Sequence, residues 1–186
     1  MSDASATLYL LAALASVLVA TRAARAGAGW WRLRGQRLVI CPETHAPAAV
    51  ALSGSCTAVH AVFDSSSLWL STCSRWPSRR NCDQACVPQI AAAPEDTLVR
   101  TIANRWFAGK TCGYCGKPIA GSPFVAHAPA LRGHDGPTLQ WTDVPAEYLP
   151  TLFRTHVPVC WSCHIAETFR HTHPDLVTDR ADTRRL

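Results

Sequence analysis

The stretch CWSCH, at residues 160–164, allows two very different folds for the second half of this chain. C-x-x-C-H is the attachment signature of a c-type haem, in which two thiols bond the porphyrin vinyl groups and the histidine ligates the iron. The same pattern arises when a histidine follows the second C-x-x-C pair of a zinc-binding domain. The first interpretation predicts an electron carrier outside the cytoplasm. The second predicts a small fold held together by metal.

Another cysteine pair favours zinc. The stretch CGYCG, at residues 112–116, carries a C-x-x-C that is separated from the later pair by 44 residues. Two such pairs supply the four thiolates of a closed tetrahedral zinc site. Gly116 follows the second cysteine, where a knuckle turn needs a positive φ. We therefore predict a structural zinc ion, with disulfides or free thiols as the alternative. Its ligands would be Cys112, Cys115, Cys160 and Cys163.

The haem alternative takes Cys160, Cys163 and His164 as its attachment residues. It leaves the CGYC pair without a partner pair. Because Met1 is the only methionine, the second axial ligand would be another histidine. Haem attachment also takes place on the side of the membrane opposite to the one that the charges around the N-terminal apolar segment predict.

Four further cysteines form a second candidate metal group in the first half of the chain. Two of them end apolar runs that are typical of strands, and the other two are spaced by one helical turn. A second zinc ion or an iron–sulfur cluster would suit these thiols, and small buried thiols in a strand core are the alternative. The group is Cys41, Cys73, Cys82 and Cys86, and Cys56 belongs to neither group.

Residues 4–21 form an apolar segment without a single charge. Eighteen residues at helical rise span about 27 Å, close to the hydrocarbon core of a bilayer. Trp30 and Trp31 add aromatic side chains suited to the headgroup level. No polar face interrupts the segment, which favours a transmembrane helix over a buried helix of a soluble protein.

The charges around this segment favour a retained single-pass anchor over a cleaved signal peptide. The triplet at residues 24–26, Ala-Arg-Ala, resembles a cleavage site, but the leading MSDAS has Asp3 as its only charge, whereas a signal peptide begins with a basic region. The basic residues follow the segment instead, which by the positive-inside rule predicts that the C-terminal part faces the cytoplasm. They are Arg22, Arg25, Arg32, Arg34 and Arg37.

The positive charge is concentrated beside the apolar segment. The 186 residues carry a net charge of +5, of which residues 1–37 contribute +4 and residues 38–186 only +1. Such a distribution suits anionic lipid headgroups and argues against nucleic-acid binding, which needs a basic surface on the folded domain. Cytosolic thiols also stay reduced, so the nine cysteines are more typical of metal ligands than of disulfides.

The chain is long enough for one modest domain or two small ones. The sequence predicts four parts. The anchor with its basic flank comprises residues 1–36, and a small β-rich domain comprises residues 37–90. A helix followed by the zinc-binding domain comprises residues 91–176, and a flexible tail comprises residues 177–186. We expect strands at 37–41, 48–52, 58–63 and 67–73, and a helix at 94–107. The expected fold class is α+β, with a transmembrane helix, a β-meander and a zinc-ribbon or treble-clef-like domain.

CGYCG, then His127, then VPVCWSCHIAET resembles a treble-clef zinc finger of the HNH nuclease type, over residues 109–171. The resemblance implies a first knuckle, a strand bearing an Asp-His pair, and a second knuckle that opens a helix. Ala126 stands where the aspartate is expected, and the chain has no asparagine after Asn104. The resemblance therefore implies the zinc scaffold more than the nuclease, although His127 and His164 could serve a divergent metal hydrolase.

The sequence offers no nucleophile elbow or phosphate loop. His171 and His173 could form a peripheral metal site, but are more typical of a solvated helix end. We expect a non-enzymatic accessory or scaffold subunit that contacts membrane lipid and other subunits of a membrane complex, without nucleic acid or a small-molecule substrate. The alternatives are an electron-transfer protein, with haem or an iron–sulfur cluster, and the divergent hydrolase.

Overall fold

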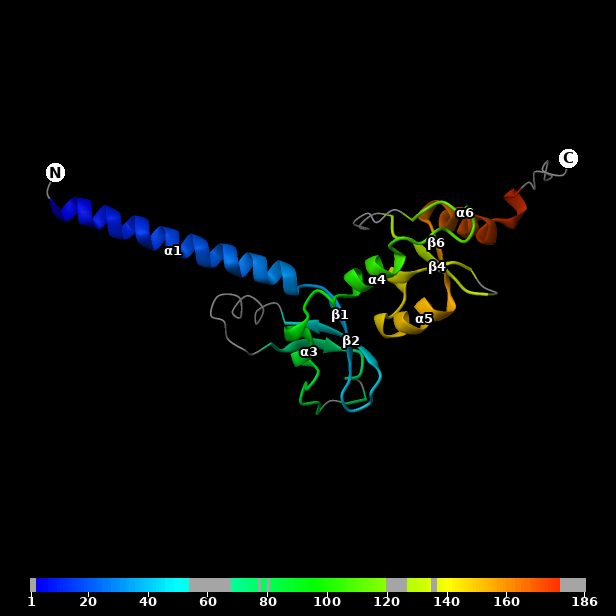
Figure 1. Cartoon of the computed structure of the whole chain (residues 1–186), viewed down its shortest axis with the longest axis horizontal. Helices are drawn as coiled ribbons and strands as arrows, with labels where there is room; N and C mark the ends of the chain where they lie inside the picture. The colour runs from blue at the N-terminus through cyan, green and yellow to red at the C-terminus, as the bar shows by residue number, and fades with distance from the viewer. Residues whose placement is uncertain are drawn as a thin grey trace. The chain divides into compact units, whose positions relative to one another are not determined.

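The computed structural model describes residues 3–53, 68–76, 78–79, 81–119, 127–134 and 137–177. Its elements belong to two compact units, unit 1 at residues 1–99 and unit 2 at residues 100–186 (Figure 1). Helices and small antiparallel sheets are mixed along the chain, which confirms the α+β class. The predicted strand at 58–63, Cys56, Ala126 and the tail at 178–186 lie outside the described residues.

Helix α1 (Asp3–Leu33) contains the apolar segment. Residues Thr7–Ala28 are long and apolar enough to cross a membrane, as the sequence predicts, and none of this segment is buried in the protein. The hydroxyls of Ser16 and Thr21 donate to carbonyls of the preceding turn, at 2.8 and 3.0 Å. These two hydroxyls are thereby satisfied within the helix, as a lipid environment requires.

Unit 1 contains a three-stranded antiparallel sheet in the order β1-β2-β3, with a short helix packed on it. Leu38 pairs with Ala49, and Val50 pairs with Cys73. The side chain of Gln89 bonds both backbone groups of Ile40, at 3.0 and 2.7 Å, and so fixes the helix to the first strand. The elements are β1 (Gln36–Ile40), β2 (Pro47–Leu52), β3 (Leu70–Cys73) and α3 (Val87–Ala92). The core residues are Val39, Ala48, Val50, Leu70, Cys86 and Ile90.

Arg37 is fully buried in unit 1, which corrects its assignment to the basic flank of the membrane segment. Its guanidinium donates to the carbonyl of Pro94 and, at 3.1 Å, to the hydroxyl of Thr97. Burial lowers the pKa of Arg37 below its usual value, although Glu95 opposes this effect. Arg37 therefore holds the segment after α3 against β1 and does not face lipid headgroups.

The predicted helix at 94–107 begins later, as α4 (Val99–Phe107). Its expected first turn instead pairs with β1, where the Leu38 N–H donates to the Thr97 carbonyl at 2.7 Å and Arg37 forms a bridge with Leu98. A backbone group that pairs with a strand is not free to start a helix, so the tertiary contact delays the helix by one turn.

Unit 2 has a second antiparallel sheet, in the order β5-β4-β6. Ala130 lies at its centre, paired with both Gln140 and Val159. Trp106 of α4 stacks on Phe153 at 4.6 Å and donates its indole N–H to the Phe153 carbonyl at 3.0 Å. The further elements are β4 (Ala130–Arg132), β5 (Leu139–Gln140), the 3-10 turns Trp141–Asp143 and Ala146–Tyr148, α5 (Leu149–Thr155), β6 (Val157–Val159), α6 (Trp161–Thr172) and the 3-10 turn Pro174–Leu176.

Candidate metal centre

The first C-x-x-C pair lies in a tight turn after α4. The Cys112 N–H donates to the Lys117 carbonyl and the Gly116 N–H donates to the Cys112 carbonyl, both at 2.9 Å. Gly116 has a φ of 69°, the left-handed conformation that the sequence predicts for this position. The Gly113 N–H donates to the Pro158 carbonyl at 2.9 Å, which holds the turn against strand β6.

The second pair lies where β6 passes into α6. Cys160 is the residue before the helix, with extended dihedral angles, and Cys163 lies in its first turn. The backbone N–H of Cys160 donates to the sulfur of Cys112 at 3.3 Å. This bond and the contact of Gly113 with β6 bring the two pairs together across 44 residues of sequence.

The four sulfur atoms of the two pairs lie within 4.8 Å of one another, in the arrangement that the sequence predicts. Cys115 and Cys160 have their sulfurs 3.8 Å apart. A tetrahedral site with metal–sulfur bonds of about 2.3 Å has sulfur–sulfur edges of about 3.8 Å. Cys112 is buried, Cys115 is exposed, and the other two are half-buried. This group could hold a metal as a single ion or as an iron–sulfur centre.

The thiols of this group do not ionise alike. Burial opposes ionisation of Cys112, but the backbone N–H groups of Cys115, Cys160 and Tyr114 outweigh burial and lower the pKa of Cys112 to about 6. Burial raises the pKa values of Cys160 and Cys163, and the bonds of Cys163 to the neighbouring sulfurs raise its pKa further. One thiolate is therefore favoured and further ones are opposed unless a cation joins them. Metal binding at this group would release protons.

His164 has a structural role in unit 2. Its side chain is 8% exposed, and its Nδ1 lies 2.6 Å from the hydroxyl of Thr138, which is 7% exposed. Burial lowers the pKa of His164, although Asp143 opposes this effect, which favours the neutral ring. This arrangement does not favour the haem alternative, because the sulfurs of Cys160 and Cys163 face the CGYC pair. The sequence gives no signal for Thr138.

We expect Thr138→Val to destabilise unit 2 by about 1–3 kcal/mol, because it leaves a buried imidazole nitrogen without its partner. The measurement is the free energy of unfolding of the full chain in denaturant. Thr155→Val is the matched control, since Thr155 makes the same kind of bond to His156, at 2.8 Å, on an exposed surface. Equal effects of the two substitutions would contradict a structural role for the buried pair.

The histidines singled out by the sequence, all of which the structure describes, do not share a group of potential metal ligands. His127 and His164 each lie beside the ring of Trp161, at 5.4 and 5.9 Å between centroids. His173 packs on Phe169 at 5.0 Å, and His171 borders an open cavity of about 500 Å³. Within the described part of the chain, none of these histidines belongs to a cluster of three or more potential ligands.

The second cysteine group lies in unit 1. Cys41, Cys73, Cys82 and Cys86 all border one small cavity at the end of the sheet. Among the described residues, a closer set of potential ligands at the same place consists of Glu43, Cys82 and Asp83, whose ligand atoms lie within 4.8 Å of one another. No local pattern in the sequence predicts the two carboxylates.

No protein-family model, curated protein or solved structure matches this chain. The resemblance of residues 109–171 to a treble-clef module therefore rests on the sequence pattern of CGYCG, His127 and VPVCWSCHIAET alone.

Proposed function

We propose that this protein is a membrane-anchored, non-catalytic accessory or scaffold subunit whose unit 2 is built around a structural zinc ion of the ribbon or treble-clef type. The observation that carries the proposal is the convergence of four sulfurs within 4.8 Å. Four thiolates fill the tetrahedral coordination of zinc and leave no position for water or substrate, which is the pattern of structural sites.

The spacing of the sulfurs favours one ion over a cluster. A single tetrahedral ion requires the edge of about 3.8 Å that Cys115 and Cys160 already show. An iron–sulfur cluster distributes its four thiolates over two or more iron atoms, which separates most of the sulfurs further. All four sulfurs of this group are close together.

Unit 2 is a fold that benefits from a metal. Its strands have only two or three residues each. Such short strands provide few ladder hydrogen bonds, and zinc binding would contribute directly to the folding free energy of the unit.

The membrane part of the proposal rests on α1. Trp31, at the end of the apolar segment, is exposed, and the guanidinium of Arg34 lies 3.2 Å from the centre of its ring. A tryptophan with an adjacent cation suits the headgroup level of a bilayer. A signal sequence also passes the test of length and composition, but the basic residues follow the apolar segment, which favours a retained anchor with the two units in the cytoplasm.

Apolar side chains on α6 support a role in assembly. Ile165 and Phe169 are spaced by four residues, so they lie on one face of the helix, and both are exposed. Leu176, after the helix, is exposed as well. We propose that this face contacts other subunits of a membrane complex.

Extraction of the protein from its native membrane with a mild detergent tests the proposal. We expect a complex larger than the monomer, with zinc bound and without iron. Haem absorption with one iron per chain would replace the proposal with an electron carrier and would reverse the topology. An isolated monomer that contains zinc would contradict the subunit role and would still support the zinc site.

A further inference from the structure

Unit 1 gathers four cysteines from three separate segments around one cavity of about 20 Å³. This volume is close to that of one water molecule or one metal ion. From these contacts we propose that unit 1 holds a second structural zinc ion, bound by the thiolates of Cys41, Cys73, Cys82 and Cys86. This site is separate from the one in unit 2 and does not depend on it.

The turn that carries Cys41 repeats the backbone geometry of the knuckle in unit 2. The His45 N–H donates to the Cys41 carbonyl at 2.8 Å, and His45 has a φ of 52°. Gly116 makes the corresponding bond to Cys112, at 2.9 Å, with a φ of 69°. A non-glycine residue with positive φ is uncommon, so the surrounding contacts must hold this turn in place. Thr44 stands where the second cysteine of a knuckle would be, so the turn offers one sulfur instead of two.

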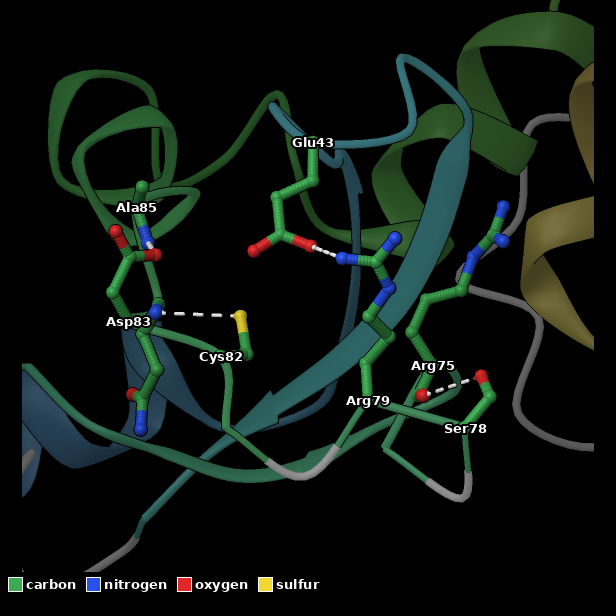
Figure 2. A network of polar contacts seen from close by, with 8 residues as sticks. Glu43, Arg75, Ser78, Arg79, Cys82, Asp83 and Ala85 are labelled. Carbon is green, nitrogen blue, oxygen red and sulfur yellow. Dashed lines mark hydrogen bonds and ion pairs between the residues drawn. The ribbon is translucent and has the colours of Figure 1, made fainter.

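The sulfurs of Cys73 and Cys82 accept backbone hydrogen bonds, as does Cys112 in unit 2. The N–H of Arg75 lies 3.5 Å from the sulfur of Cys73. The N–H of Gln84 lies 3.4 Å from the sulfur of Cys82, and this bond is drawn in Figure 2. In each case the donor is two residues after the cysteine. Both cysteines border the cavity, and these bonds fix the positions of their sulfurs there.

Cys86 closes the group from the core side. Its side chain is buried in the hydrophobic cluster of unit 1, directly before α3. It borders the same cavity as Cys41, Cys73 and Cys82. Four thiolates around one cavity would repel one another, and a divalent cation between them would remove that repulsion.

The carboxylates at the cavity are already engaged. Glu43 forms an ion pair with Arg79 at 2.5 Å, and Asp83 accepts the N–H of Ala85 at 3.1 Å (Figure 2). Arg75 also borders the cavity, where its charge offsets part of the excess negative charge of a zinc ion with four thiolates. Because zinc also accepts thiolate ligands readily, we assign the four sulfurs, and not the set of Glu43, Cys82 and Asp83, as ligands.

The size of the cavity favours zinc over an iron–sulfur cluster. A cluster places at least two irons and two sulfides between its thiolates and does not fit a space of one ion. In the described part of the chain, the four cysteine sulfurs of unit 2 lie within 4.8 Å of one another. The four cysteine sulfurs of unit 1 do not meet this limit and are more widely spaced. We expect the turns of Cys41 and Cys82 to close on the ion when it binds.

Zinc counting on the purified full-length chain tests this site. We expect two zinc ions per chain, one after Cys82→Ser, one after Cys115→Ser, and none in the double variant. Cys56→Ser is the matched control, because Cys56 belongs to neither group, and should retain two. One zinc that survives Cys82→Ser and is lost in Cys115→Ser would overturn the second site and leave the proposed function intact. A single zinc ion that is lost in Cys82→Ser and retained in Cys115→Ser would support this site and would contradict the proposed zinc site in unit 2.

Cobalt substitution of the same chain identifies the ligands without relying on a cysteine variant that folds poorly. Two tetrahedral all-thiolate centres should give twice the thiolate-to-cobalt absorption of one centre. Glu43→Gln should change neither the zinc count nor this spectrum, since the carboxylate pairs with Arg79. Loss of one metal in Glu43→Gln, or one centre with mixed ligand character, would overturn the four-thiolate assignment.

Discussion

Cys163→Ser is expected to release the metal of unit 2 and to unfold this unit in the full-length protein. Structural zinc contributes about 10–16 kcal/mol to the folding of small zinc domains at neutral pH, which exceeds the total stability of most domains. Serine is a far weaker zinc ligand, and its introduction leaves three thiols close together without the ion that joins them. The measurements are zinc content and the rate of proteolysis within residues 100–177.

Cys56→Ser controls for the loss of a thiol as such, because Cys56 lies outside both cysteine groups. A strong chelator applied to the unmodified protein should reproduce the effect of Cys163→Ser, and added zinc should reverse it. If the Cys163→Ser protein retained its metal and its resistance to protease, Cys163 would not be a ligand and the four-sulfur site would be wrong.

The second large effect concerns the membrane. Replacement of Leu14 and Val17 by arginine places two charges in the middle of the apolar segment of α1, where both side chains are exposed. Each arginine at the centre of a membrane helix costs about 2.5–3.5 kcal/mol, so we expect an insertion penalty of about 5–7 kcal/mol. The variant should move from the membrane fraction to the soluble fraction after alkaline carbonate extraction.

Leu14→Ile with Val17→Ile keeps the segment apolar and should stay in the membrane. Sequencing of the N-terminus of the mature protein completes the experiment. A chain that begins after residue 26 would show that α1 is a cleaved signal sequence, and unmodified protein in the soluble fraction would also contradict the anchor.

Local patterns account for most of what could be predicted of the fold. The apolar segment, the strands at 37–41 and 48–52, and the helix after CWSCH all depend on nearby residues, because hydrophobic periodicity and turn residues act over one or two turns of chain. The boundary of α4 could not be predicted, because its first expected turn pairs with β1. That pairing joins residues about sixty positions apart, and no pattern in the neighbouring residues predicts it.

The two cysteine groups also differ in how far the sequence alone predicts them. The sequence by itself determined the four candidate ligands in unit 2, because two C-x-x-C pairs carry their own turn geometry and have few other uses. In unit 1 the cysteines are not paired in knuckles, and only the fold of the sheet and the segment after it decided that they border one cavity. The burial of Arg37 and the contact of His164 with Thr138 were likewise decided by tertiary structure. A buried polar group bonds to whichever partner the packing brings near, and the neighbouring residues do not predict that partner.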